Sequence, residues 1–493
     1  MLYLIIFTPI VSAILILIGA PARKMALLGS VFVLGLTLLA FAFFQPSSRY
    51  PFQYNSSISV LPDWKLNFTI GLDGLSLVMV LLSAIVTVAA VWFTGAIEKY
   101  ERGFYACLLF ISGGAIGAFA SLDLFFFYAF HELALIPTFL LIGIWGSGNR
   151  NAAAWKITIY LAIGSFILLI GLILLYQSIP AGARTFEIAK LKTAAATLPP
   201  DAQKNIYLLL LIGFGILVSL FPFHSWAAEA YASAPAPAAM LHAGVLKKFG
   251  LYGLLRLAWP LVPMGAHYWT WLLVLLLLGN IIYIGLVTIA QKKLDWMLGY
   301  SSVMHMGYIF LGFASSNVLG LTGAAVLIFA HGISIALLFA IAGEVRKSTG
   351  TLDFEELGGL GKVMPFAGLA FGFGAFAAIG LPGLANFAGE IMIFFGAFAT
   401  DWELSRFHMF QIATVLGLWG VVISAVYMLR AYRRVFMGTL NGRDKNVIDL
   451  RRSLRLPVTL LIAATVWIGF FPQPFVQRMA PTFRSYFNAT PPR

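Results

Sequence analysis

Long apolar runs, separated by short polar segments, recur along the whole chain. A membrane-spanning helix needs about 20 consecutive apolar residues to cross the hydrocarbon core of a bilayer. The runs are continuously apolar rather than alternating, and this pattern excludes a transmembrane β-barrel. Fourteen runs reach spanning length, at residues 2–20, 26–44, 75–96, 104–121, 124–145, 157–178, 205–222, 236–258, 269–290, 298–314, 318–343, 365–400, 410–430 and 456–472.

Two of these runs contain residues that interrupt helices. The run at 365–400 is too long for one straight crossing and contains Gly-Leu-Pro-Gly at 380–383. The run at 205–222 ends in Phe-Pro-Phe-His at 221–224, so the breaks fall in the seventh and twelfth spans. Paired broken helices at matching positions are typical of inverted repeats in transporters. We therefore predict an all-α polytopic membrane protein of about fourteen transmembrane helices, with two inverted five-helix repeats and broken helices seven and twelve.

The same pattern predicts four regions along the chain. They are three N-terminal transmembrane helices (1–103), the first repeat (104–260), the second repeat (261–436), and a cytoplasmic loop with the last transmembrane helix and an outer tail (437–493). The composition agrees, because 60% of the 493 residues are hydrophobic and only 10% are charged. Soluble domains average roughly 25% charged residues and cannot hide so much apolar surface. Soluble enzymes, nucleic-acid-binding proteins and disordered scaffolds are therefore excluded.

The net charge of +13 is explained by membrane topology. Cytoplasmic loops of membrane proteins carry an excess of Lys and Arg. When the N-terminus is placed outside, most of the 32 Lys and Arg fall in cytoplasmic segments, so we predict that both termini lie outside. The expected partner of this charge is the lipid bilayer and no nucleic acid. The single cysteine, Cys107, permits no internal disulfide and no cysteine-based cluster or zinc site.

Two carboxylates lie inside apolar spans, where a charge costs about 2.5–3.5 kcal/mol. Glu132 lies well inside the fifth span, and Glu390 follows the break in the twelfth. Each is either a structural carboxylate, protonated or hydrogen-bonded between helices, or a group that carries protons. Because ionisable residues within membranes are functional as a rule, we favour the proton-carrying interpretation for both. We also expect Glu390 to face a hydrated interior pocket, since a carboxylate against lipid would meet the full desolvation cost.

Two lysines and three histidines also lie in predicted spans. Lys247 and Lys248 are adjacent in the eighth span, and neighbours on a helix point about 100° apart, so they cannot share one environment. A desolvated lysine loses its proton readily, which suits a relay, whereas structural pairing with buried acids is the alternative. His242, His305 and His331 can pass protons between their ring nitrogens, but single histidines in helices are often satisfied core residues. Their spacing fits no metal-binding motif.

Several segments resemble the antiporter-like subunits of respiratory complex I. They are HELALIP in the fifth span, FPFHSW followed by APAPAAMLHAGVLKKFGLYGLLR, LGYSSVMHMGY in the tenth span, LDFEELGGLGKVMPF, and GLPGLANFAGEIMIFFGAF in the twelfth span. The resemblance extends from about residue 66 to about residue 434. It points to chain M of bacterial NADH:quinone oxidoreductase, the proton-translocating subunit homologous to mitochondrial NADH dehydrogenase subunit four, because chain L usually has lysine at the position of Glu390.

The resemblance implies a membrane-arm subunit of a translocase that couples electron transfer to proton translocation. The family's proton-carrying positions correspond to Glu132 on the input side, Lys248 at the centre, His331 as a relay and Glu390 on the output side. Lys247 and His242 are secondary candidates for this proton relay. The resemblance implies no cofactor or metal in this chain, and it implies NADH, flavin, iron–sulfur clusters and quinone in partner subunits. The implied partners are neighbouring antiporter-like chains in the bacterial inner membrane.

One position departs from the family pattern. The family has a lysine seven residues before the histidine of its P-x-H-x-W segment, as partner of the span-five glutamate, and this sequence has Leu217 there. Three functions therefore stay open. In the first, the chain conducts protons by another route, for which Lys247 is a candidate. In the second, it is a non-pumping structural subunit. The third is a multi-subunit sodium/proton antiporter, which shares the fold and for which Asn386 beside Glu390 is a weak hint.

Overall fold

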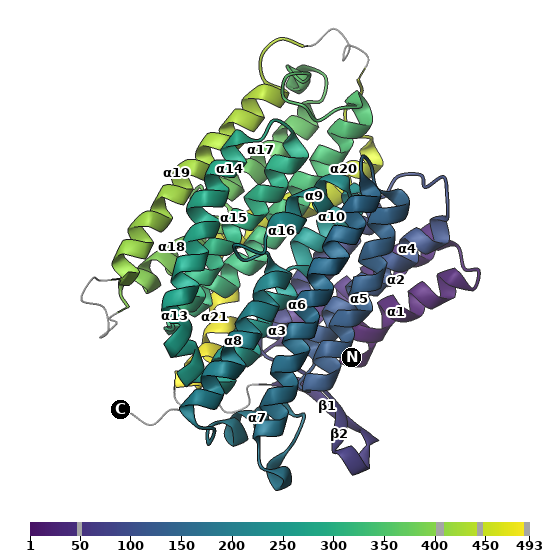
Figure 1. Ribbon diagram of the computed structural model, residues 1–493. Helices are drawn as coiled ribbons and strands as arrows, with labels where there is room; N and C mark the ends of the chain where they lie inside the picture. The colour runs from purple at the N-terminus through teal and green to yellow at the C-terminus, as the bar shows by residue number, and fades with distance from the viewer. Residues whose placement is uncertain (47–51, 401–408, 441–446, 488–493) are drawn as a thin grey trace.

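Helices form at all fourteen predicted apolar runs in the computed structural model, which describes residues 1–46, 52–400, 409–440 and 447–487. Ten helices within these described residues are long and apolar enough to cross a membrane. The long helices lie side by side, and the first helix (Leu2–Leu17) begins and the last helix (Gln473–Phe487) ends towards the same end of the bundle (Figure 1). The chain is therefore a polytopic helical membrane protein.

The elements follow the order of the predicted spans. The first group is α1 (Leu2–Leu17), α2 (Ala22–Phe43), β1 (Gln53–Leu61), η1 (Pro62–Trp64), β2 (Leu66–Leu72), α3 (Gly74–Phe93), α4 (Glu101–Ala120), α5 (Leu124–Trp145), α6 (Arg150–Ser178), η2 (Ala181–Ala183), α7 (Ile188–Ala195), α8 (Pro200–Val218) and α9 (Ser225–Ser233). The second group is α10 (Ala236–Leu241), η3 (His242–Leu246), α11 (Lys248–Gly253), η4 (Leu254–Ala258), α12 (Trp259–Leu261), α13 (Pro263–Leu278), η5 (Gly279–Ile284) and α14 (Gly285–Ala290). The last group is α15 (Leu294–Ala314), α16 (Val318–Thr349), η6 (Leu360–Lys362), α17 (Pro365–Ile379), α18 (Ala385–Phe398), α19 (Met409–Phe436), α20 (Arg452–Phe470) and α21 (Gln473–Phe487).

The centre of the bundle is formed by α3 and α16, because both helices are buried on all sides. The long helix α16 packs against α15, α17 and α18 as well as against α3. In contrast, α6 lies at the periphery and exposes large apolar side chains at intervals of three or four residues. These side chains are Trp155, Ile159, Ile163, Phe166 and Ile170. An apolar helix face of this kind is stable against lipid or against other membrane helices.

Both predicted helix breaks are present. Between α8 and α9 the chain leaves the helix at Ser219, whose backbone is left-handed with a φ of 67°. Between α17 and α18, Gly380 and Gly383 have φ values of 81° and 87°. Glycine adopts such angles without steric cost, which explains why the interruption falls at these residues. Broken helices inside a membrane are stable where the freed backbone groups are covered by protein or line a cavity.

The predicted eighth span is one continuous helix with two wide turns. Its α-helical pieces α10, α11 and α12 are joined by the π-helical segments η3 and η4. In η3 the backbone amide of Lys247 donates to the carbonyl of His242, five residues earlier, at 3.0 Å. A π turn holds one residue more than an α turn and often marks a functional position. The wide turn therefore changes the direction in which the following lysines point.

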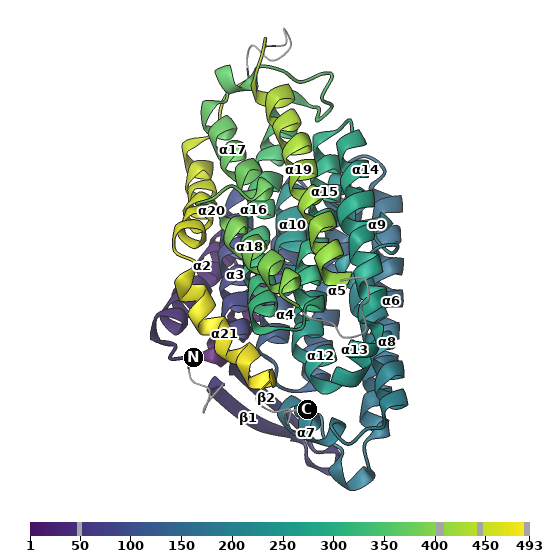
Figure 2. The same cartoon turned by 90° about the vertical axis from the view of Figure 1, so that its left-hand side faces the viewer.

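A β-hairpin at one end of the bundle accompanies the predicted helices. Strands β1 and β2 pair antiparallel, with Ser57 opposite Thr69. The short helix α7 and the amphipathic helix α21 lie at the same end, where α21 packs obliquely against α3 and α16 (Figure 2). All these segments carry too many polar residues to give a spanning signal, so the hydrophobic pattern did not predict them. We call this end, with β1, β2, α7 and the C-terminal part of α21, the hairpin end.

A buried ion pair joins three distant segments at the hairpin end. Arg256 of η4 pairs with Asp73, which also caps the first turn of α3 by accepting from the backbone amide of Ser76 at 2.9 Å. Thr482 of α21 donates to the second carboxylate oxygen of Asp73 at 3.0 Å. Arg256 also donates to the hydroxyl of Tyr252 at 3.1 Å. The apolar pattern along the sequence gave no sign of this pairing, because its members are separated by most of the chain.

We expect the substitution Arg256→Gln to destabilise the folded chain by about 3–5 kcal/mol, because it leaves the Asp73 carboxylate buried without a counter-charge. The double substitution Asp73→Asn with Arg256→Gln should be less destabilising, since no buried charge remains. Thermal unfolding of the purified complex, with retention of this chain as a second readout, measures both effects. A single variant as stable as the unmodified chain would contradict the role of this ion pair.

Candidate functional site

Lys248 and His331 form a buried pair at the centre of the bundle. The Nζ atom of Lys248 lies 2.8 Å from Nδ1 of His331, and the side chain also lies 3.8 Å from the sulfur of Met306. Both residues are buried, Lys248 completely. Among the described residues no carboxylate lies within ion-pair distance of Lys247 or Lys248. The two lysines are therefore not structural partners of buried acids, and the contact to His331 allows direct proton exchange.

Lys247 points to a different part of the bundle. Its Nζ atom lies 3.3 Å from the backbone carbonyl and 3.4 Å from the hydroxyl of Ser302, on α15. It also lies 5.8 Å from the ring centre of Tyr231, on α9. Lys248 in contrast points towards α16. The two adjacent lysines therefore have separate environments, as the helical geometry predicted.

His305 belongs to the central cluster, although it was not among the candidate relay residues. Its ring lies 5.4 Å from the ring of His331. Its Nε2 atom lies 2.7 Å from the carbonyl of Ala378, in the last turn of α17 before the break. The other nitrogen, Nδ1, lies 2.7 Å from the carbonyl of Ser301. His305 thus lies between the Lys248–His331 pair and the broken helix α17–α18. No local sequence signal indicates this contact between the segments.

Glu390 is buried against the break between α17 and α18. Its carboxylate lies directly against Gly380, where a β-carbon would force the side chain to move. The Oε1 atom has no hydrogen-bond partner among the described residues. Tyr308 of α15 lies within electrostatic range of this carboxylate, and its ring packs 5.7 Å from that of His305. Glu390 therefore faces the interior of the chain.

Glu132 differs from the other candidates because its side chain reaches the outer surface of the bundle. The side chain is 39% exposed, on the peripheral helix α5. It accepts a hydrogen bond from Ser165 of α6 and lies 3.7 Å from Nδ1 of His131. Within the described residues no lysine or arginine pairs with it. Leu217, at the position of the missing lysine, is buried and lies near Gly250 of α11.

A polar cavity of about 400 Å³ opens at the end of the bundle opposite the hairpin end. Arg346 closes its inner side: it pairs with Asp295 and donates to the Ser147 hydroxyl at 2.9 Å and to the Ala232 carbonyl at 3.0 Å. Two small cavities of about 20 and 10 Å³ follow towards the interior, and Tyr231 lines both of them. Each is of the size that holds about one water molecule.

His242 lies at the inner end of this series of cavities. It lines the innermost cavity, and its Nδ1 atom lies 3.3 Å from the hydroxyl of Tyr231. Its Nε2 atom is buried without a hydrogen-bond partner among the described residues. Such a buried polar atom is costly unless a water molecule satisfies it. Tyr231, Asp295 and Arg346 were not predicted as site residues, because they lie at helix ends and meet only in the folded chain.

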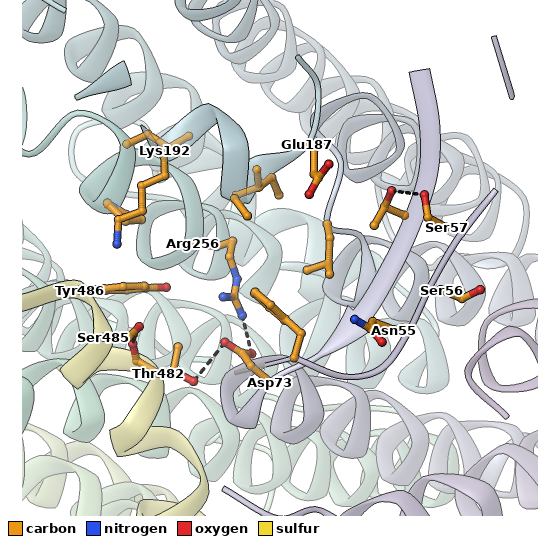
Figure 3. A pocket seen from close by; sticks show the side chains of 17 residues that line it. Asn55, Ser56, Ser57, Asp73, Glu187, Lys192, Arg256, Thr482, Ser485 and Tyr486 are labelled. Carbon is orange, nitrogen blue, oxygen red and sulfur yellow. Dashed lines mark hydrogen bonds and ion pairs between the residues drawn. The ribbon is translucent and has the colours of Figure 1, made fainter. Parts of the chain in front are cut away.

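A second cavity, of about 470 Å³, lies at the hairpin end (Figure 3). The Asp73–Arg256 pair lines it, together with Lys192 of α7 and Tyr486 of α21. Leu122, just before α5, lines this cavity, and Ser147, just after α5, lines the polar cavity, so the two cavities lie at opposite ends of the bundle. None of the predicted relay residues lines the larger cavity. Within the described residues, no group of three or more His, Cys, Asp or Glu side chains is arranged to hold a metal ion.

Comparisons with known proteins identify the family and the fold of this chain. Residues 121–417 match the family described as NADH:quinone oxidoreductase/Mrp antiporter, transmembrane. F(420)H(2) dehydrogenase subunit M of Methanosarcina mazei is 33% identical over 97% of this chain and 96% of its own length. NADH-quinone oxidoreductase subunit M of Rickettsia typhi is 30% identical over 95% and 94%.

Solved structures show the same fold. A chain of respiratory complex I from Thermus thermophilus, solved with bound NADH, is 28% identical and matches with a TM-score of 0.89 over 99% of both chains. A chain of the Mrp complex from Dietzia sp. DQ12-45-1b matches with a TM-score of 0.85 at 21% identity, over 99% of this chain and 97% of that one, which shows the fold alone. The family match and the near full-length relatives show that this chain is a membrane-arm subunit of a complex I-type oxidoreductase and belongs to the antiporter-like subunit M family.

Proposed function

We propose that this chain translocates protons through the membrane arm of its complex while partner subunits carry out the electron transfer. The observation that carries this proposal is the fully buried Lys248, which contacts His331 at 2.8 Å and has no carboxylate partner among the described residues. A buried lysine that served only stability would be expected to have a counter-charge. Electron transfer then involves NADH or another donor, flavin, iron–sulfur clusters and quinone in partner subunits.

In this proposal the chain crosses the membrane fourteen times, with inverted repeats at 104–260 and 261–436. An even number of crossings agrees with a first helix that begins and a last helix that ends towards the same end of the bundle (Figure 1). The excess of Lys and Arg at the other end then makes the hairpin end the outer, periplasmic side of a bacterial inner membrane. The broken helices α8–α9 and α17–α18 occupy corresponding places in the two repeats.

Proton uptake starts at the polar cavity beside Asp295 and Arg346. From there a proton passes through the two one-water cavities to the Tyr231 hydroxyl and to Nδ1 of His242. A water molecule at the unpartnered Nε2 atom of His242 would carry it on to Lys247, whose side chain lies beside Tyr231. This route does not use the position of Leu217, so Lys247 takes over the delivery for which the family uses its span-seven lysine.

Proton release follows the central cluster towards the second break. The Lys248 ammonium donates to Nδ1 of His331, and the proton leaves from the other ring nitrogen towards His305, so the imidazole returns to its neutral form. Tyr308 continues the line from His305 to Glu390, the output-side carboxylate. The ring centres of His331, His305 and Tyr308 follow one another at 5.4 and 5.7 Å, so a water molecule in each gap, and one between Lys247 and Lys248, would complete the proposed transfers. No redox group in this chain is needed.

The exposed carboxylate of Glu132 supports a neighbouring membrane subunit as partner. A carboxylate that is 39% exposed near the middle of a spanning helix would face lipid if α5 were uncovered. An adjacent antiporter-like chain that covers α5 and α6 would remove this cost and supply a hydrogen-bond donor or cation to Glu132. Glu132 then acts as the input-side group that senses the neighbouring chain.

We expect Lys248→Ala to lower the rate of proton translocation by roughly 100-fold, as for the loss of a general acid–base group. Lys247→Ala should have a smaller effect, because it leaves the contact between Lys248 and His331 in place. The measurement is the number of protons moved per electron by the complex in sealed vesicles, with quinone reduction followed in parallel. The reverse order of the two variants would assign the central role to Lys247.

Glu132→Gln should lower the number of protons moved per electron while quinone reduction continues, because glutamine keeps the hydrogen bond to Ser165 but holds no titratable proton. Glu355, an exposed acid outside the spans, provides the matched control as Glu355→Gln. If the two variants moved the same number of protons per electron, Glu132 would be a structural carboxylate.

Tyr231→Phe should slow proton uptake by roughly tenfold, since it removes the hydroxyl contact to His242, worth about 1 kcal/mol, and its place in the water line. The aromatic ring and its packing remain. Tyr105→Phe is the matched control, because Tyr105 is equally buried but lines none of these cavities. The rate of vesicle acidification measures the effect, and equal rates in the two variants would place uptake elsewhere.

A further inference from the structure

The cavity of about 470 Å³ at the hairpin end has a polar and an apolar side. Ser56 and Ser57 line it from the hairpin, and Thr482 and Ser485 line it from α21 (Figure 3). The remaining wall is mostly apolar and includes Phe52. None of the proposed proton-transfer steps uses this cavity. A cavity with such a mixed wall fits an amphiphilic ligand.

The cavity lies at the level where spanning helices begin and end. Asp73 directly precedes α3, Leu122 lies just before α5, and Leu261 is the last residue of α12. The two amphipathic helices α7 and α21 border it. In a bilayer this level is that of the lipid headgroups, where a polar group and an apolar chain of one molecule meet.

One positive charge in the wall is left without a counter-charge. Arg256 is neutralised by Asp73, and Glu187 pairs with Lys190 at 2.6 Å. Lys192 also lines the cavity, but it pairs with no carboxylate among the described residues. Its Nζ atom instead lies 5.1 Å from the ring centre of Tyr486.

Lys192 is also partly desolvated. Burial lowers the pKa of the Lys192 ammonium from its ordinary value, and this lysine lies in α7, outside the spanning helices. An anion beside the ammonium would offset the desolvation, because an opposite charge favours the charged form. The cavity therefore lacks a negative group next to Lys192.

We propose that this cavity binds a phosphate group, with the Lys192 ammonium as its charge partner. The apolar wall holds the glycerol and first acyl carbons when the phosphate belongs to a phospholipid headgroup. The proposed phosphate site is separate from the proposed proton route, so the test of one proposal does not depend on the other.

Protection of Lys192 from acylation tests the proposal in the purified, delipidated complex. An amine-reactive acylating reagent is applied with dioctanoyl phosphatidylglycerol, with inorganic phosphate, or with dioctanoylglycerol, and modified lysines are quantified by mass spectrometry. At a ligand concentration of ten times Kd, modification of Lys192 should fall about tenfold. Lys190, on the same helix and 69% exposed, is the internal control and should keep its rate.

The three ligands separate the sources of the phosphate. Protection by phosphatidylglycerol alone assigns the site to a lipid headgroup, and equal protection by inorganic phosphate assigns it to a free anion. No protection by either phosphate compound, or equal protection by dioctanoylglycerol, would overturn the proposal. As a second measurement, native mass spectrometry should show that the Lys192→Gln complex loses most of its bound phosphatidylglycerol. The Lys190→Gln complex should retain it.

Discussion

The cost of a charge inside a membrane-spanning bundle is the constraint on which this structure depends. The chain meets this cost in two ways. Near the ends of the bundle it pairs opposite charges, as in Asp73 with Arg256 and Asp295 with Arg346. At the centre it places Lys248 against the neutral donor and acceptor atoms of a histidine. Paired charges hold helices in place, whereas an unpaired basic group is free to gain and lose a proton.

The positions of the cavities agree with this separation of paired charges near the ends from unpaired basic groups at the centre. Both large cavities end at an ion pair, and the small cavities between Arg346 and His242 are each about the size of one water molecule. Lys248 and His331 are both buried, so the proposed route passes protons between side chains there rather than through bulk water. A continuous water channel would dissipate the gradient that such a subunit is proposed to build.

Glu132 and Leu217 show how the chain depends on its surroundings. The carboxylate reaches the surface of α5 instead of the interior, and the position at which the family has its partner lysine is occupied by a buried leucine. In the proposed route Lys247, on the neighbouring span and beside Tyr231, takes the place of that lysine.

The sequence by itself determined the class of fold, the places of the helices and most of the ionisable residues of the centre. Run length and continuous apolarity are local properties that indicate a spanning helix, and glycine and proline mark breaks through their own backbone limits. The tertiary structure alone decided the β-hairpin, the buried Asp73–Arg256 pair, the place of His305 and the outward position of Glu132. These features arise from contacts between residues far apart in the chain, such as Lys248 and His331, which lie 83 positions apart. Apolar periodicity carries no information about which faces of two distant helices meet, because in a membrane nearly every face is apolar.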